Sequence, residues 1–175
     1  MKILPISILE HELARIMAGE QTSLRRPAGL LGKCQAGDRL WIREPFHLTP
    51  RFDAMPPTVA EMHKAIFYFA VDLGDAPPEA LGARRFARTL PKSMHRHHLQ
   101  IVSSEQARLQ DIKDAEVTAA GFASRADYAA AWNKGLSLQV EQVRWAFDPI
   151  VDLVHFTYVA KPALDPATPQ KEHAA

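Results

Sequence analysis

Thirteen prolines divide the chain into short segments, and this feature limits the fold more than any other in the sequence. Proline lacks the backbone N–H that a helix interior or a central strand uses, so it marks helix ends, loops and sheet edges. Prolines gather at 45–62 and 72–94, where we expect irregular chain, and at 161–175, where we expect a mobile C-terminal tail. Short strands and short helices joined by loops are what such a chain can form.

Between these stretches, runs and alternations of apolar residues predict the regular elements. We expect strands at 2–9, 39–44, 65–71, 97–109 and 150–160, and helices at 10–18, 111–120 and 124–133. Asp111 and Ser124 suit the N-caps of the last two helices, and a glycine follows each helix as a stop signal. Because strands and helices do not alternate, a doubly wound sheet is excluded. The order predicts an α+β fold that is mainly β, a small barrel decorated by short helices.

Composition sets limits on domains, compartment and partners. The 175 residues suffice for one domain, which we place at 1–160. Twenty-one Lys and Arg residues against 20 Asp and Glu leave a net charge of +1, so a site for a polyanion must be a local patch. The single cysteine, Cys34, excludes an internal disulfide and a multi-cysteine zinc site. With no apolar run of membrane-spanning length, we expect a cytoplasmic protein that does not contact a membrane.

Four segments and their order resemble a known family. They are AGEQTSLRR (18–26), AGDRLWIRE (36–44), LPKSMHRHHLQI (90–101) and RLQDIKDAEVTAAGF (108–122), followed by a tryptophan-containing segment before the last strand. Together they resemble the ASCH domain family, in particular the versions encoded in phages and prophages. The likeness extends to about Val159, is most specific in the second segment, and leaves out 45–89.

The resemblance implies a PUA-like fold, a small pseudo-barrel of mixed strands with a cleft at one end. It also implies a module that binds RNA or a nucleotide, and some members hydrolyse the amide of N4-acetylcytidine. Those members use a lysine, a threonine and a glutamate, and the matching positions here are Gln21, Leu24 and Ala120. These residues supply no titratable base, no hydroxyl and no carboxylate. The match therefore implies that the amidohydrolase triad is absent, and the sequence leaves open whether this is an enzyme.

The implied cleft provides the candidate ligand-binding residues. They are Gln21, Thr22, Arg25, Arg26, Arg43 and Glu44. Arginine suits phosphate because its planar guanidinium donates two parallel hydrogen bonds and keeps its charge. The structural alternative is that the two adjacent arginines form surface ion pairs with Asp38 or Glu44. Glu44 would bridge to Arg25 or Arg39, and we expect the nearby positive charges to lower its pKa.

Residues 82–98 show the strongest charge asymmetry of the chain. Their basic side chains form a candidate phosphate patch with no acid among them: Arg84, Arg85, Arg88, Lys92 and Arg96. The alternative is a solvated loop whose charge is balanced by acids elsewhere. Three histidines here could ligate a metal, but on a strand His95 and His97 would point one way and His98 the other. Two ligands do not close a zinc site, so no metal is expected.

The other notable side chains fit structural roles. Trp41 and Trp132 are expected to fill the core rather than to bind bases. His155 stands between apolar residues in the last strand, and we expect a satisfied core or edge histidine rather than a catalytic one. Cys34 lies in a glycine-rich loop, where we expect it to be exposed. No partner residue marks it as a nucleophile.

Three functions are compatible with these observations. The first is a binding module for RNA or a nucleotide, which needs no cofactor. The second is an enzyme, a nucleoside-modifying hydrolase or a weak ribonuclease, which would need a histidine such as His95, His97 or His98 beside Arg25 or Arg26. The third is a phage or prophage accessory protein that acts through protein contacts, for which an exposed apolar patch would be the sign.

Overall fold

A computed structural model describes residues 1–74, 76–136 and 141–160. The strands are β1 (Ile3–Ser7), β2 (Ser23–Pro27), β3 (Arg39–Arg43), β4 (Phe46–Leu48), β5 (Phe67–Phe69), β6 (Arg84–Arg85), β7 (His97–Arg108) and β8 (Ile150–Ala160). The helices are α1 (Glu10–Met17), α2 (Pro57–Met62), α3 (Asp114–Ala119) and α4 (Arg125–Gly135). None of these helices has the length and apolar character needed to cross a bilayer.

The main sheet has five strands in the order β1-β3-β7-β8-β2. β1 runs parallel to β3, and the other neighbours are antiparallel. The α+β class is thus confirmed, but the expected closed barrel is not found within the described ranges. Each edge strand contains a proline, Pro5 in β1 and Pro27 in β2, and a proline cannot donate a hydrogen bond to a further strand. These edges favour an open sheet.

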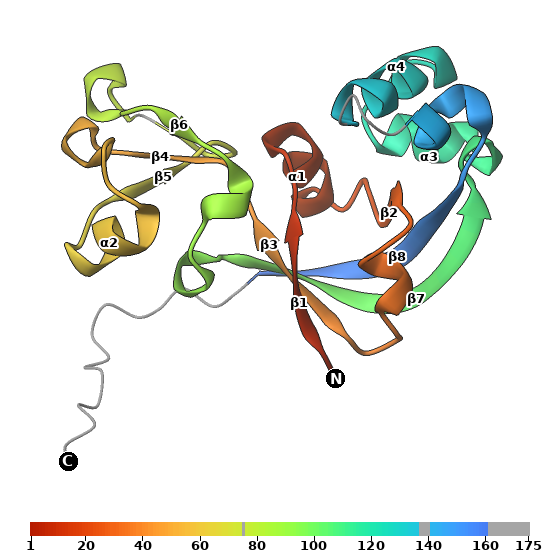
Figure 1. The fold of residues 1–175 in the computed structure, drawn as a ribbon, viewed down its shortest axis with the longest axis horizontal. Coiled ribbons are helices and arrows are strands. Elements are labelled where there is room, and N and C mark those ends of the chain that lie inside the picture. Colours follow the sequence, from red (N-terminus) through yellow and green to blue (C-terminus); the bar gives the residue numbers. More distant parts are fainter. Residues whose placement is uncertain (75, 137–140, 161–175) are drawn as a thin grey trace.

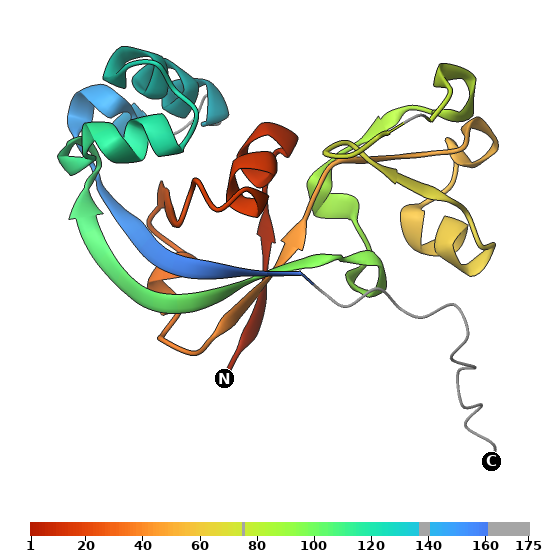
Figure 2. The same ribbon diagram turned by 180° about the vertical axis from the view of Figure 1, so that it is seen from behind.

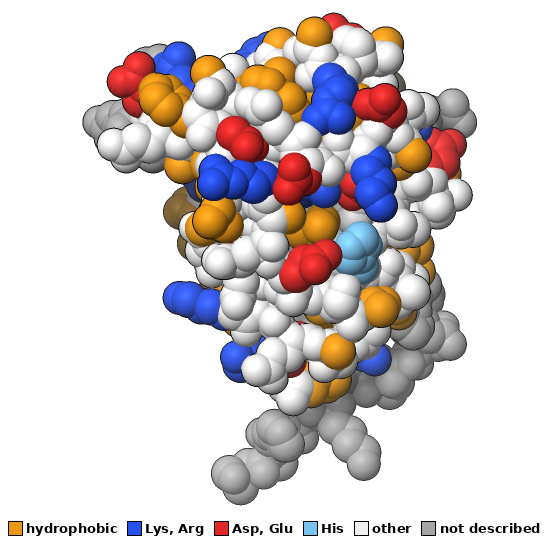
Figure 3. Space-filling view, turned by 90° about the vertical axis from the view of Figure 1, so that its right-hand side faces the viewer, with side chains coloured by type: hydrophobic (Ala, Val, Ile, Leu, Met, Phe, Trp, Pro, Cys, Tyr) orange, Lys and Arg blue, Asp and Glu red, His pale blue; other side chains and the backbone are white. Residues whose placement is uncertain are grey.

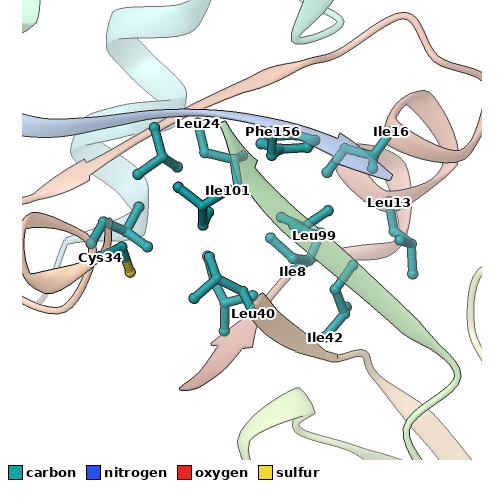
Figure 4. Packing of buried hydrophobic residues seen from close by; sticks show 13 residues of the cluster. Ile8, Leu13, Ile16, Leu24, Cys34, Leu40, Ile42, Leu99, Ile101 and Phe156 are labelled. Carbon is teal, nitrogen blue, oxygen red and sulfur yellow. The ribbon is translucent and has the colours of Figure 1, made fainter. Parts of the chain in front are cut away.

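The main core lies between the sheet and α1. Leu13 and Ile16 on one face of α1 are fully buried, and they pack with Leu40, Ile42 and Leu99 from the central strands (Figure 4). The helix predicted at 10–18 and the strand predicted at 39–44 are thus present, and their apolar residues face this core. Trp41, on the opposite face of β3, is also buried, as expected.

Residues 45–94 form a second lobe instead of the predicted irregular chain. β4 pairs with β5 and β6 in a three-stranded antiparallel sheet (Figure 2). This lobe has its own apolar core around Phe46, Phe52 and Phe69. The strand predicted at 65–71 is only three residues long and lies at the edge of this sheet. The prolines did not prevent a helix, because Pro57 occupies the first turn of α2, where its missing N–H costs nothing.

A long ribbon of β7 and β8 carries the helical part of the molecule at its end. The two strands pair from His97 opposite Ala160 to Arg108 opposite Ile150, with one irregularity near Ile101 (Figure 1). α3 and α4 lie within the connection between them. We refer to residues 109–149, so far as they are described, as the cap.

The predicted cap helices are both present, with shifted boundaries. α4 ends at Gly135 rather than at 133, and Lys113 rather than the predicted Asp111 is the N-cap of α3. α3 begins at Asp114 rather than at 111, because residues 109–111 form a separate 3₁₀ turn. Ser124 is confirmed as the N-cap of α4, since its hydroxyl accepts a hydrogen bond from the backbone N–H of Asp127. The tail predicted at 161–175 lies outside the described residues.

Candidate functional site

A pocket of about 700 Å³ lies between α1, β2 and the cap. These elements meet in the upper right part of Figure 1. One side of the pocket is polar, and its lining includes Glu12, Gln21, Ser23, Arg25, Arg26 and Glu116. The other side is apolar and aromatic, with Phe122, Tyr128 and Trp132. The size falls within the range of small-molecule sites, and the mixture of surfaces is typical of them.

Arg15 joins two of the pocket walls. From α1, its guanidinium donates hydrogen bonds of 2.7 and 2.8 Å to the carbonyl oxygens of Ala119 and Thr118, at the C-terminus of α3. Gly121 then turns the chain away with a φ of +92°, and a Cβ at this position would lie 2.9 Å from the Arg15 side chain. The sequence therefore holds α1 and α3 in a fixed relation.

Arg25 and Glu116 form the polar base of the pocket. The two guanidinium nitrogens lie 2.7 and 3.3 Å from the two carboxylate oxygens, and Glu116 also accepts a hydrogen bond from the backbone N–H of Lys113. Burial would raise the pKa of Glu116, but the hydrogen bonds from Arg25 and Lys113 outweigh it and lower the pKa below its usual value. Glu116 is therefore a carboxylate at neutral pH.

Gln21 and Arg26 meet at Glu12 of α1. Arg26 Nη2 lies 2.7 Å from a Glu12 oxygen, and Gln21 Nε2 donates to the carbonyl of Ser23 at 3.1 Å. Because both Ser23 and Glu12 offer acceptors to this amide nitrogen, the orientation of the Gln21 amide is defined. Its oxygen is buried and has no hydrogen-bond partner among the described residues. An unpaired buried acceptor costs about 1–3 kcal/mol, and a ligand donor could pair with it only after the Gln21 side chain moved.

Contacts within the cap hold the aromatic wall in place. Tyr128 makes edge-on ring contacts with Phe122 and Trp145, and the indole N–H of Trp132 donates to the carbonyl of Val143 at 2.8 Å. Burial raises the pKa of Tyr128, so its phenol stays protonated. Trp132 is half-buried and belongs to neither apolar core, so the predicted core position is wrong, and it lines the pocket instead.

The candidate cleft residues separate into two groups. Gln21, Arg25 and Arg26 line the pocket, whereas Arg43 and Glu44 lie at the end of β3, outside its lining. Thr22 is exposed and does not line it either. Of the positions matched to the amidohydrolase triad, Gln21 and Ala120 line the pocket, and Leu24 is buried in the main core.

Glu44 belongs to a buried ionic cluster at the junction of the two lobes. It is 1% exposed and pairs with Arg96 at 2.8 Å, so the predicted partners Arg25 and Arg39 were wrong. Arg96 also pairs with Asp72, and its guanidinium lies over the ring of Phe69. The predicted fall in the pKa of Glu44 is also wrong, because burial raises the pKa by more than the Arg96 hydrogen bonds lower it.

The basic side chains of residues 82–98 do not form one patch, because several of them are engaged in ion pairs or hydrogen bonds. Arg84 pairs with Glu10 at 2.8 Å, Arg85 donates to the backbone carbonyls of Phe52 and Asp53, and Arg96 belongs to the buried cluster. Arg88 and Lys92 have no ion pair within the described ranges. On the face that carries the cap, acidic and basic side chains are likewise interspersed rather than gathered by sign (Figure 3). A phosphate contact in 82–98 therefore depends on a few residues.

The predicted placement of the three neighbouring histidines, with His95 and His97 on one face and His98 on the other, is wrong. His95 lies in the turn before β7, and its Nε2 is 2.9 Å from Nε2 of His98. His97 points into the junction of the lobes, where its Nδ1 lies 2.7 Å from the Tyr158 hydroxyl and its Nε2 lies 3.6 Å from Glu44. In the part of the chain that the structure describes, no group of three or more ligand side chains could hold a metal.

One other sequence prediction needs correction. Cys34 is buried, not exposed, because the 3₁₀ turn at Leu31–Lys33 packs it into the main core. His155 is partly exposed on β8, and its Nε2 lies 3.8 Å from a Glu105 oxygen.

Several pocket residues were missed by the sequence analysis. His11 and Glu12 look like ordinary polar positions of an amphipathic helix, and Glu116 precedes the matched Ala120 by four residues. That spacing places Glu116 and Ala120 on one face of a helix, which is the signal that could have indicated Glu116.

Comparison with models of protein families, with curated proteins and with solved structures found no significant match.

Proposed function

We propose that this chain is a PUA-like, ASCH-type module that binds RNA or a nucleotide, and that the pocket receives an unpaired base. The observation that carries the proposal is the pairing of an aromatic wall, Tyr128 and Trp132, with an oriented glutamine amide in one pocket. Aromatic side chains stack on single-stranded bases, and side-chain amides read base edges. The resemblance of residues 18–26 and 108–122 to ASCH motifs supports the same function, since both segments contribute to this pocket.

The charges of the pocket favour a neutral base over a phosphate at its polar side. Arg25 and Arg26 are each neutralised by a carboxylate at 2.7 Å, from Glu116 and Glu12. Lys134, near the end of α4, is a lining cation without an ion pair in the described ranges. It is the group we expect to meet a phosphate.

The first experiment is a binding measurement by fluorescence anisotropy. Labelled single-stranded RNA, single-stranded DNA and a hairpin RNA are titrated at two salt concentrations, against the wild type and two pocket variants, Lys134→Gln and Gln21→Met. We expect the wild type to bind unpaired strands more tightly at low salt, and both variants to bind more weakly. Lys64→Gln, an exposed lysine on the second lobe, is the control. Absence of binding to every probe would contradict the proposal.

Enzymatic activity, as a nucleoside-modifying hydrolase or a weak ribonuclease, is the second candidate function, and one observation favours it. A histidine does line the pocket with Arg25 and Arg26, although it is His11 and not one of the three that we named. Histidine is the commonest general acid or base, so a nuclease or hydrolase could use it. The bound RNA should therefore be examined on a gel, because cleavage that His11→Gln abolishes would make the enzyme the leading function.

A further inference from the structure

Phe86 is a solvent-exposed aromatic side chain on an ordered turn. It is 67% exposed, yet its backbone carbonyl accepts hydrogen bonds of 2.9 Å from the N–H of Thr89 and 2.7 Å from the Thr89 hydroxyl. The guanidinium of Arg88 lies 5.2 Å from the centroid of the ring. A single exposed aromatic ring is common on protein surfaces, so the role of Phe86 depends on the groups around it.

Arg43 extends this surface toward the main sheet. Its Nη1 lies 3.5 Å from the carbonyl oxygen of Arg88, and its guanidinium lies 5.8 Å from the Trp41 ring. Neither Arg43 nor Arg88 has an ion pair within the described ranges, in contrast to Arg84 and Arg96. The surface therefore offers an aromatic face beside two cations, which matches the base and the phosphate of a nucleotide.

The surface and the pocket lie on two sides of α1. Arg84, two residues before Phe86, pairs with Glu10, whereas Glu12 lines the pocket. Residues two apart on a helix point in nearly opposite directions, and a helix with its side chains is about 10–12 Å wide. Figure 1 accordingly shows α1 between the lobe that contains β6 and the cap. A strand of a few nucleotides could cross this distance, whereas a mononucleotide could not.

We infer that Phe86, Arg88 and Arg43 form a second contact surface for a single-stranded nucleic acid that has one base in the pocket. This inference rests on the proposed function. The Phe86 ring stacks on a base, and the two guanidinium groups contact phosphates on either side of it. The partner is thus a strand of several nucleotides rather than a free nucleotide.

The test compares short and long probes on a variant of this surface. Binding of the four ribonucleoside monophosphates and of mixed-sequence eight-nucleotide RNA and DNA is measured for the wild type and for Phe86→Ala/Arg88→Gln. We expect the variant to lose about tenfold or more in affinity for the octamers, with no change for the monophosphates. Arg88→Gln alone should reduce the slope of log affinity against log salt by about 0.7. Comparison of the RNA octamer with the DNA octamer shows which nucleic acid the protein prefers.

A matched control exists on the cap. Phe147 is 56% exposed and follows Arg144 on a similar turn, so Phe147→Ala/Arg144→Gln removes the same two residue types elsewhere. An equal loss in this control, an unchanged octamer affinity in the test variant, or a parallel loss for the monophosphates would each overturn the inference. If the wild type binds monophosphates and the Phe86→Ala/Arg88→Gln variant binds the octamers as tightly as the wild type does, the proposed function stands without the second surface. If no probe binds the wild type, the proposed function itself fails.

Discussion

The guanidinium of Arg25 lies 2.7 Å from the carboxylate of Glu116, although 91 residues separate them. This ion pair joins β2, at the edge of the main sheet, to α3 in the cap. Because the Arg25 side chain is 5% exposed and that of Glu116 is 22% exposed, the contact stabilises the position of the cap as well as the base of the pocket. The adjacent pair, Arg26 with Glu12, is more exposed on its arginine side.

Arg25→Ala should therefore destabilise the protein, and Arg26→Ala should not do so to the same degree. Removing Arg25 leaves a mostly buried carboxylate without its partner, at a cost of about 2–4 kcal/mol in the free energy of unfolding. The partly exposed Arg26 pair should contribute less than about 1 kcal/mol. Urea unfolding of both variants measures this difference. Equal midpoints for Arg25→Ala and the wild type would show that the pair does not hold the cap.

His97 should make the folded protein sensitive to mild acid. Burial, with the nearby Arg96, lowers its pKa from the ordinary 6.5 to about 4, despite the opposing charge of Asp72. Between these two values the unfolded chain binds a proton that the folded protein does not, so stability falls as the pH drops from 6.5 to 4. The loss should be up to about 3 kcal/mol.

The variant His97→Gln isolates this effect, because glutamine can still accept the hydrogen bond of Tyr158 but does not titrate. The other titratable groups around His97 are Tyr158, Glu44, Arg96, Asp72, His95 and His98, and they are present in both proteins. The free energy of unfolding is measured from pH 7 to pH 4. If the two proteins lose stability in parallel, His97 is not the group responsible.

Gly32→Ala should be costly and Gly29→Ala nearly neutral. The backbone N–H groups of both glycines donate to one oxygen of the buried Asp152, at 2.7 Å each. A Cβ on Gly32 would lie 2.7 Å from the other Asp152 oxygen, whereas a Cβ on Gly29 would have nothing closer than 3.9 Å. We expect a loss of about 1–3 kcal/mol for Gly32→Ala and less than about 0.5 kcal/mol for Gly29→Ala. Thermal unfolding of the two variants shows whether close packing against Asp152 holds the loop that contains Gly29 and Gly32.

Cys34 should not react with a thiol reagent while the protein is folded. It is 5% exposed, and burial raises its pKa, which reduces the fraction of reactive thiolate. One equivalent of thiol should react after addition of urea and almost none before. Rapid reaction in native buffer would mean that the turn at Leu31–Lys33 opens readily.

The main sheet could largely be predicted from the sequence, and the second lobe could not. Local patterns sufficed for β3, β8 and α4, where alternation, an apolar run and a serine N-cap each indicate one structure. The lobe at 45–94 was missed because prolines at helix starts and in turns look like breaks, although such positions need no backbone N–H.

The candidate site was predicted in part, and the missing part has one physical cause. Arg25 and Arg26 were recognised, but their partners Glu116 and Glu12 come from other elements. Glu44 likewise pairs with Arg96, 52 residues away, instead of an arginine near it in the sequence. Ion pairs that close long loops leave no local pattern, so a sequence shows the charge but not its partner.

The ribbon of β7 and β8 has a consequence for how such a protein can change. Arg108 and Ile150 are paired, so the cap leaves and rejoins the sheet at two adjacent points. The length and sequence between these points can vary without moving any strand of the sheet, as in the loop of a hairpin. The aromatic wall of the pocket lies entirely in this segment, while the arginines and Gln21 lie outside it. A change within this segment would therefore alter the aromatic wall and Glu116, while Gln21, Arg25 and Arg26 would keep their places on the rest of the fold.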